Sequence, residues 1–174
     1  HLPDNVTKIG NYAFSNCTHM RMALPNGLIE IGMGCFNNSW IVVDELPSTL
    51  TKIGNDAFNN CSNVTISKLP EGLTSLGHSV FESCKNITTM EIPTGIVNIY
   101  SNCFAGCGGL EKVHCKGDIV KIYDEAFRYD TNLTTVILSN VTTVPTLGTN
   151  VFSSTKISNN KGYITSKGAN DPVG

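Results

Sequence analysis

Every phenylalanine in this chain lies on one near-regular grid, and this grid constrains the fold more than any other feature. The steps between successive phenylalanines are 22, 22, 23, 23, 23 and 25 residues, from Phe14 through Phe36, Phe58, Phe81, Phe104 and Phe127 to Phe152. A period of about 20–29 residues is typical of chains built from stacked copies of one short unit, in which each copy buries its apolar face against its neighbours. The spacing therefore predicts a repeat solenoid.

Alignment on the phenylalanines gives a common unit that reads roughly L-P-x-x-L-x-x-I-G-x-x-A-F-x-x-C-x-x-L. Before the proline, polar and apolar residues alternate, as in Thr89-Met90-Glu91-Ile92, and this alternation predicts a strand with Met90 and Ile92 buried. Proline has no N–H and so ends the strand. The L-x-x-I-G segment is expected to form the return path, with its glycine easing the turn. Stacked in register, the strands would form a parallel sheet with about 4.8 Å between coils, and the rings would stack at about 5–7 Å.

Three segments of the unit carry a family resemblance: Ala13–Cys17, Ala57–Cys61 and Val80–Cys84, which read A-F-S-N-C, A-F-N-N-C and V-F-E-S-C. Each is preceded by I-G or L-G and followed by an apolar anchor and L-P. They closely resemble the BspA-like leucine-rich repeat family, also called the Treponema pallidum type, over residues 2–152. The resemblance implies a right-handed leucine-rich-repeat superhelix, mainly β, with a parallel sheet on one face and short turns or 3-10 segments on the other.

This resemblance also sets expectations for domain organisation and function. We expect a solenoid of six to seven coils over residues 1–152 and an irregular cap or tail over 153–174, with room for a further short strand at 162–164. Relatives occur in secreted and surface proteins and are implicated in adhesion to host matrix proteins. The resemblance thus implies a non-enzymatic adhesion module of a secreted or cell-surface protein that recognises a protein or glycan. Two alternatives stay open, namely a structural spacer without a ligand and an accessory module of a larger surface enzyme.

Composition and charge exclude several other classes of protein. The formal net charge is −2, so no basic face calls for nucleic acid. No apolar run approaches the roughly 20 residues of a membrane span. Acidic residues are scattered at unrelated phases, and Ser, His and Asp recur in no recognisable order, so we predict no enzyme, no catalytic residue and no cofactor. We expect a monomer, and because Leu2-Pro3 already lies in mid-repeat, we expect a longer parent protein whose signal sequence is absent here.

The seven cysteines all occupy structural columns of the repeat, which favours a ladder of buried free thiols. Disulfides are the alternative, since adjacent coils would bring Cys61, Cys84 and Cys107 within bridging range. A zinc site is a weaker alternative, because its four candidate ligands belong to columns that point in different directions. Those candidates are Cys103, Cys107, His114 and Cys115.

Asparagine triplets of the N-x-S/T type recur along the chain and have two interpretations. As glycosylation acceptors they would lie in surface loops of a secreted protein. As structural residues they would hydrogen-bond the turn backbone, and the shared phase of Asn63, Asn86 and Asn132 favours this interpretation.

The outward positions of the predicted strands are the best candidate site, because solenoids commonly bind ligands along such extended surfaces. Alternation predicts two outward columns, one with Ala23, Glu45, Lys68, Glu91, His114 and Ile137, the other with Arg21, Val43, Ile66, Thr89, Lys112 and Thr135. From these we select as candidate ligand-binding residues Arg21, Val43, Glu45, Ile66, Lys68, Thr89, Glu91, Lys112 and His114. The structural alternative is a solvated face with cross-strand ion pairs, each worth under about 1 kcal/mol. An exposed Trp40 would be a second indication of binding.

Overall fold

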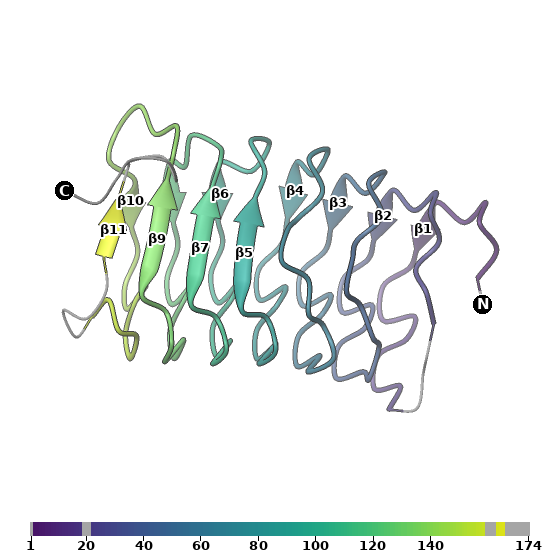
Figure 1. Ribbon diagram of the computed structural model, residues 1–174. Helices are drawn as coiled ribbons and strands as arrows, with labels where there is room; N and C mark the ends of the chain where they lie inside the picture. The colour runs from purple at the N-terminus through teal and green to yellow at the C-terminus, as the bar shows by residue number, and fades with distance from the viewer. Residues whose placement is uncertain (1, 19–21, 159–162, 166–174) are drawn as a thin grey trace.

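Each copy of the repeat forms one coil of an elongated parallel β-solenoid (Figure 1). The computed structural model describes residues 2–18, 22–158 and 163–165, and no helix occurs among them. Successive coils stack in sequence order along the long axis, so nearly all contacts join residues about one repeat apart. This arrangement confirms the predicted repeat solenoid.

One face of the solenoid is a parallel sheet with the order β11-β9-β7-β5. Its strands are β5 (Thr89–Ile92), β7 (Lys112–Cys115), β9 (Thr135–Leu138) and β11 (Tyr163–Thr165). As predicted, Met90 and Ile92 are buried while Thr89 and Glu91 face out. The sheet continues beyond Phe152, because β11 pairs with β9 and confirms a short strand close to the predicted position. The predicted boundary at residue 152 stays a prediction.

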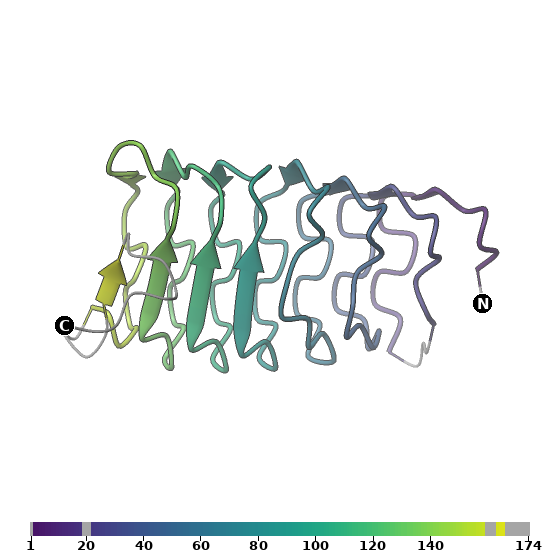
Figure 2. The ribbon, with the colours of Figure 1, turned by 45° about the horizontal axis from the view of Figure 1, so that its top comes forward.

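The return paths form two further parallel sheets of two-residue strands, which Figure 2 shows in a row along another edge of the molecule. The first contains β1 (Lys8–Ile9), β2 (Glu30–Ile31), β3 (Lys52–Ile53) and β4 (Ser75–Leu76), and the second contains β6 (Asn98–Ile99), β8 (Lys121–Ile122) and β10 (Thr146–Leu147). In every strand except β10 the second residue is buried, which accounts for the apolar residue of the L-x-x-I segment. We call these the two-residue sheets.

The phenylalanine grid becomes a single column of stacked rings inside the solenoid. Neighbouring ring centroids lie 5.4–5.7 Å apart along the whole series, within the spacing predicted from the sequence. The five inner rings, from Phe36 to Phe127, are fully buried, whereas Phe14 and Phe152 at the ends are only partly buried. Each ring therefore packs against the coil before it and the coil after it.

The turn around each phenylalanine has a backbone conformation that was not predicted from the sequence. Twelve non-glycine residues and two glycines in the described part have positive φ, and all lie two positions before or after a phenylalanine. Around Phe58, the N–H groups of Asp56, Phe58 and Asn60 all donate to carbonyls of the next coil, at 2.7–2.9 Å. The same pattern recurs in successive coils and forms a continuous ladder of hydrogen bonds. This ladder offsets the energetic cost of the left-handed backbone conformation.

The glycine of the L-x-x-I-G segment recurs for a different reason from the one expected. Gly10, Gly32, Gly54 and Gly77 do not have positive φ, so the expectation that they ease a turn is wrong. Instead, a Cβ at Gly77 would lie 2.5 Å from the backbone nitrogen of Asn55 in the preceding coil. The column therefore contains glycine because neighbouring coils approach closely there.

Asparagine side chains tie neighbouring coils together at the other turn. The Nδ2 groups of Asn63, Asn86 and Asn132 donate to backbone carbonyls of the preceding coil, at 3.3, 2.7 and 2.7 Å. These bonds confirm the structural role predicted from their shared phase.

Candidate ligand-binding groove

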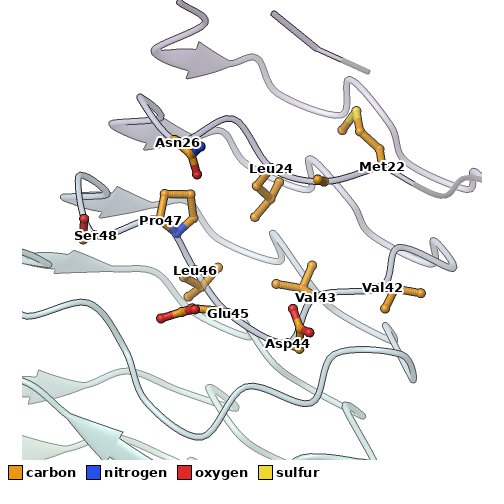
Figure 3. A pocket seen from close by; sticks show the side chains of 11 residues that line it. Met22, Leu24, Asn26, Val42, Val43, Asp44, Glu45, Leu46, Pro47 and Ser48 are labelled. Carbon is orange, nitrogen blue, oxygen red and sulfur yellow. The ribbon is translucent and has the colours of Figure 1, made fainter. Parts of the chain in front are cut away.

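Three hollows lie side by side along the strand face, which we define as the outward surface of β5, β7 and β9 and of the matching segments 22–26, 42–48 and 65–71. The first, of about 690 Å³, lies between segment 22–26 and segment 42–48 (Figure 3). The second, of about 520 Å³, lies between 44–48 and 67–71, and the third, of about 330 Å³, continues to Lys112 and His114. Adjacent hollows share residues, including Glu45 and Lys68, so together they form one continuous groove.

The two larger hollows of the groove lie where regular strand pairing is missing. Figure 1 shows β5, β7 and β9 on this face, whereas the upstream coils have no named strand there. Among the described residues of these coils, two isolated parallel bridges occur on this face, between Val43 and Val64 and between Lys68 and Glu91. Val43 follows Phe36 by seven residues, but Val64 follows Phe58 by six, so the two coils meet out of phase. This mismatch leaves the described residues of the two coils unpaired beyond the bridge and opens the second hollow, which lies between them.

The structure brings most of the predicted site residues together on this face. Strand register aligns Lys68 with Glu91 and His114, and aligns Thr89 with Lys112, as the two predicted columns require. All five line the groove, and Glu45 lines its first two hollows. Arg21 lies outside the described residues.

Two predicted outward residues point the other way. Val43 and Ile66 are 3% and 1% exposed, so their assignment to the outward surface is wrong. For Val43 the change of phase between coils explains the error, because its bridge partner Val64 is buried and a slip of one residue moves a side chain to the opposite face. Ile66 follows its phenylalanine by eight residues, as the exposed Thr89 does, so the change of phase does not explain its burial. Val42, next to Val43, is instead 51% exposed. Val43 still lines the floor of the first hollow.

The C-terminal end of both predicted columns is also covered. Thr135 and Ile137 follow the predicted register, opposite Lys112 and His114, but both are buried. Ile137 is not part of the internal apolar cluster, so it is covered on the outer side of the sheet. The open part of the strand face therefore ends at β7.

Ion pairs cross the groove from coil to coil. Lys116 Nζ lies 2.9 Å from Glu71 Oε1 and 3.0 Å from Glu91 Oε2, whereas Lys68 Nζ is 4.0 Å from Glu45 Oε1. The hydrogen bond from Lys116 lowers the pKa of Glu91, and the hydrogen bond to Glu71 raises the pKa of Lys116. Sequence reasoning missed Lys116 as a site residue, although it occupies the proline column of the repeat and is a departure from the pattern.

Other polar side chains of the groove take no part in these ion pairs. Asp44 and Lys112 form no ion pair with any described residue, and both are exposed. His114 Nε2 lies 2.5 Å from Ser139 Oγ. In the sequence just before the first hollow, Trp40 is 60% exposed. The groove thus offers charges of both signs above an apolar floor.

The cysteines are buried away from this face. All seven are free thiols and six are buried, including Cys103, Cys107 and Cys115. Burial raises the pKa of each of these three thiols, that of Cys115 to about 12. Within residues 2–18, 22–158 and 163–165, no group of three or more His, Cys, Asp or Glu side chains could hold a metal ion. No helix in the described part of the chain is long and apolar enough to span a bilayer.

Comparison with known proteins places this geometry in a family. The family model for the BspA-type leucine-rich repeat region matches six copies over residues 1–93 and 64–165. A search among curated proteins finds no match. Among crystal structures, a leucine-rich repeat protein from Bacteroides ovatus is 25% identical with a TM-score of 0.74, over 88% of this chain and 40% of that one.

Two further crystal structures share the fold. The Treponema pallidum leucine-rich repeat protein is 23% identical with a TM-score of 0.71, over 94% of this chain and 81% of that one. A leucine-rich cell surface protein from Faecalibacterium prausnitzii is 20% identical with a TM-score of 0.62, over 97% of this chain and 53% of that one. The chain thus spans well under half the length of the Bacteroides protein. With its family model matched from the first coil to β11, the chain belongs to the BspA-type leucine-rich repeat family.

Proposed function

We propose that this chain is the non-enzymatic recognition module of a secreted or cell-surface protein, and that it binds a protein partner along the groove of the strand face. A leucine-rich repeat family fits a protein-interaction module, and its proteins are typically secreted or exposed on the surface. The observation that carries the proposal is the continuous groove from segment 22–26 to β7, which crosses at least four coils. Adhesion to a host matrix protein or glycan is the specific form that we propose.

The character of the groove supports a protein partner. Its rim contains charges of both signs, including Glu45, Lys68 and Lys112, and its floor is apolar at Val43 and Met90. Protein interfaces combine an apolar centre with a polar rim in this way. The ion pairs on the face are exposed and contribute little to stability, so they are free to exchange partners when a ligand binds.

The test compares two sets of substitutions in the same chain. The first replaces Glu45, Lys68, Glu91 and Lys112 with Ala, and the control replaces Lys8, Glu30 and Lys52, which form an ion-pair ladder on the two-residue sheet. Binding of the immobilised chain is measured by surface plasmon resonance against a panel of extracellular-matrix proteins and glycans.

We expect the strand-face variant to lose binding to the panel member that the parent chain recognises, and the control variant to keep it. Equal binding by both variants would show that the partner contacts another surface. If the folded parent chain binds no panel member, the result would favour the spacer alternative, in which this part of the protein has no ligand of its own.

A further inference from the structure

The segment Asp44–Leu46 has an unusual main chain for its place in the solenoid. None of the N–H or C=O groups of these three residues has a hydrogen bond to a described residue. At the matching place in a later coil, Glu91 donates to Ser67 O at 2.9 Å and its strand pairs with β7 over four residues. The chain bends at Asp44, and along both edges the backbone groups of the segment are unpaired with any described residue, with the first and second hollows on either side.

Side chains around this segment form an apolar floor with an acidic rim. Figure 3 shows Met22 and Leu24 on one side of the first hollow and Val43 and Leu46 on the other. Val43 and Leu46 are 3% and 5% exposed, so they form the floor. Of the described residues that line the first hollow, two are exposed carboxylates, Asp44 and Glu45, and none is basic.

Unpaired backbone groups in an extended conformation are the requirement for strand addition. In this mode of recognition, main-chain hydrogen bonds supply affinity, and pockets for alternate side chains supply specificity. The ring centroids of Phe14 and Phe36 lie 5.7 Å apart, so the two coils stay packed at the core while the first hollow lies between their strand-face segments. A ligand can therefore reach the edge of Asp44–Leu46 without separating the core.

We infer that an extended peptide segment of the protein partner adds as a strand beside Asp44–Leu46, with apolar side chains in the first hollow and basic side chains against Asp44 and Glu45. This inference rests on the proposed function, because it specifies how the partner is held on the strand face. The peptide would bind at the irregular N-terminal coils. The regular coils are not available for strand addition, because β5, β7 and β9 already pair with one another through their backbone groups.

The test uses a defined probe, a capped heptapeptide of alternating valine and lysine, with the isotope-labelled chain followed by NMR. We expect its addition to shift the amide signals of Asp44–Leu46 and to slow their hydrogen exchange. Two matched peptides serve as controls. One has glutamate in place of lysine, and the other has methyl groups on alternate backbone nitrogens, which removes donors and keeps every side chain. Both should bind at least about fivefold more weakly.

Substitutions in the chain give an independent readout. The double variant Asp44→Asn with Glu45→Gln should bind the basic peptide about fivefold more weakly, because it loses two exposed carboxylates and little else. The matched control is Asp4→Asn, which removes an exposed carboxylate that lines none of the three hollows and should leave the affinity unchanged.

The outcomes distinguish this inference from the proposed function. Equal affinity for the methylated and unmethylated peptides would overturn main-chain pairing, as would signal shifts confined to β5 and β7. Unchanged signals at Asp44–Leu46 with the basic peptide at about 1 mM would overturn strand addition altogether. In each case the proposed function would still be decided by the panel experiment, which needs no particular mode of binding.

Discussion

At the scale of single residues, Asp130 is the clearest departure from the repeat. The position three after each phenylalanine contains a small hydrogen-bond donor, and the thiols of Cys61, Cys84 and Cys107 each donate to the carbonyl of a phenylalanine in the preceding coil, at 2.9–3.1 Å. Asp130 occupies this column fully buried, and neither carboxyl oxygen has a hydrogen-bond partner in the described structure. Burial raises the pKa of Asp130 to about 9, so the carboxyl is protonated at neutral pH.

This protonation predicts how stability changes with pH. The native state retains a proton that the unfolded state, with the ordinary pKa of 3.8, releases. The stability linked to Asp130 is therefore complete below about pH 4 and is lost as pH rises toward the native pKa. We expect Asp130→Asn to remove this dependence and to exceed the parent chain by several kcal/mol in the free energy of unfolding at pH 8, with little difference at pH 4.

Urea unfolding at a series of pH values measures this difference. Asp4→Asn, which removes an exposed carboxylate, is the control and should follow the parent curve. Parallel curves for the parent chain and Asp130→Asn would contradict a protonated Asp130.

At the scale of the structural element, close packing between coils decides which residues a column accepts. Gly10 and Gly77 share one column of the repeat, but a Cβ at Gly10 would meet nothing within 4 Å, whereas a Cβ at Gly77 would meet backbone atoms of Asn55 at 2.5 and 2.7 Å. Backbone atoms cannot rotate away as a side chain can. The same residue type is therefore required in one coil and optional in another.

The pair gives a matched experiment. We expect Gly77→Ala to destabilise the chain by about 2–3 kcal/mol, because the coils must separate to admit the methyl group. Gly10→Ala should change stability by less than about 0.5 kcal/mol. Thermal unfolding followed by circular dichroism compares the two variants. A similar loss of stability in both variants would indicate that the column needs glycine for its backbone conformation. The structure does not support that explanation, because neither glycine has a positive φ.

Sequence reasoning predicted the elements that depend on periodicity. The ring spacing, the buried residues of β5 and the asparagine contacts all follow from residues that recur at a fixed step. The left-handed residues beside each phenylalanine were not predicted, because residues such as Glu125 and Tyr129 give no local signal for positive φ. Hydrogen bonds to the next coil impose this conformation, and these contacts become visible only once the coils are stacked.

At the scale of the whole molecule, part of the groove lies at a change in coil length along the solenoid. The first coils have steps of 22 residues and the middle ones 23, and the second hollow lies where the two meet. Six predicted residues lie on the groove, from Glu45 to His114. Sequence reasoning did not select Asp44, Glu71 and Lys116, because none of them lies in the two predicted outward columns.

The most direct test of the strand face as the recognition surface is carboxyl footprinting with the panel partner bound. Carbodiimide labelling followed by mass spectrometry measures the exposure of individual Asp and Glu side chains with and without the partner. The account predicts that labelling of Asp44, Glu45 and Glu71 falls several-fold on binding, while Asp4 and Asp124, which line none of the three hollows, stay as reactive as in the free chain. Loss of labelling at Asp4 and Asp124, with the three groove carboxylates unchanged, would contradict it.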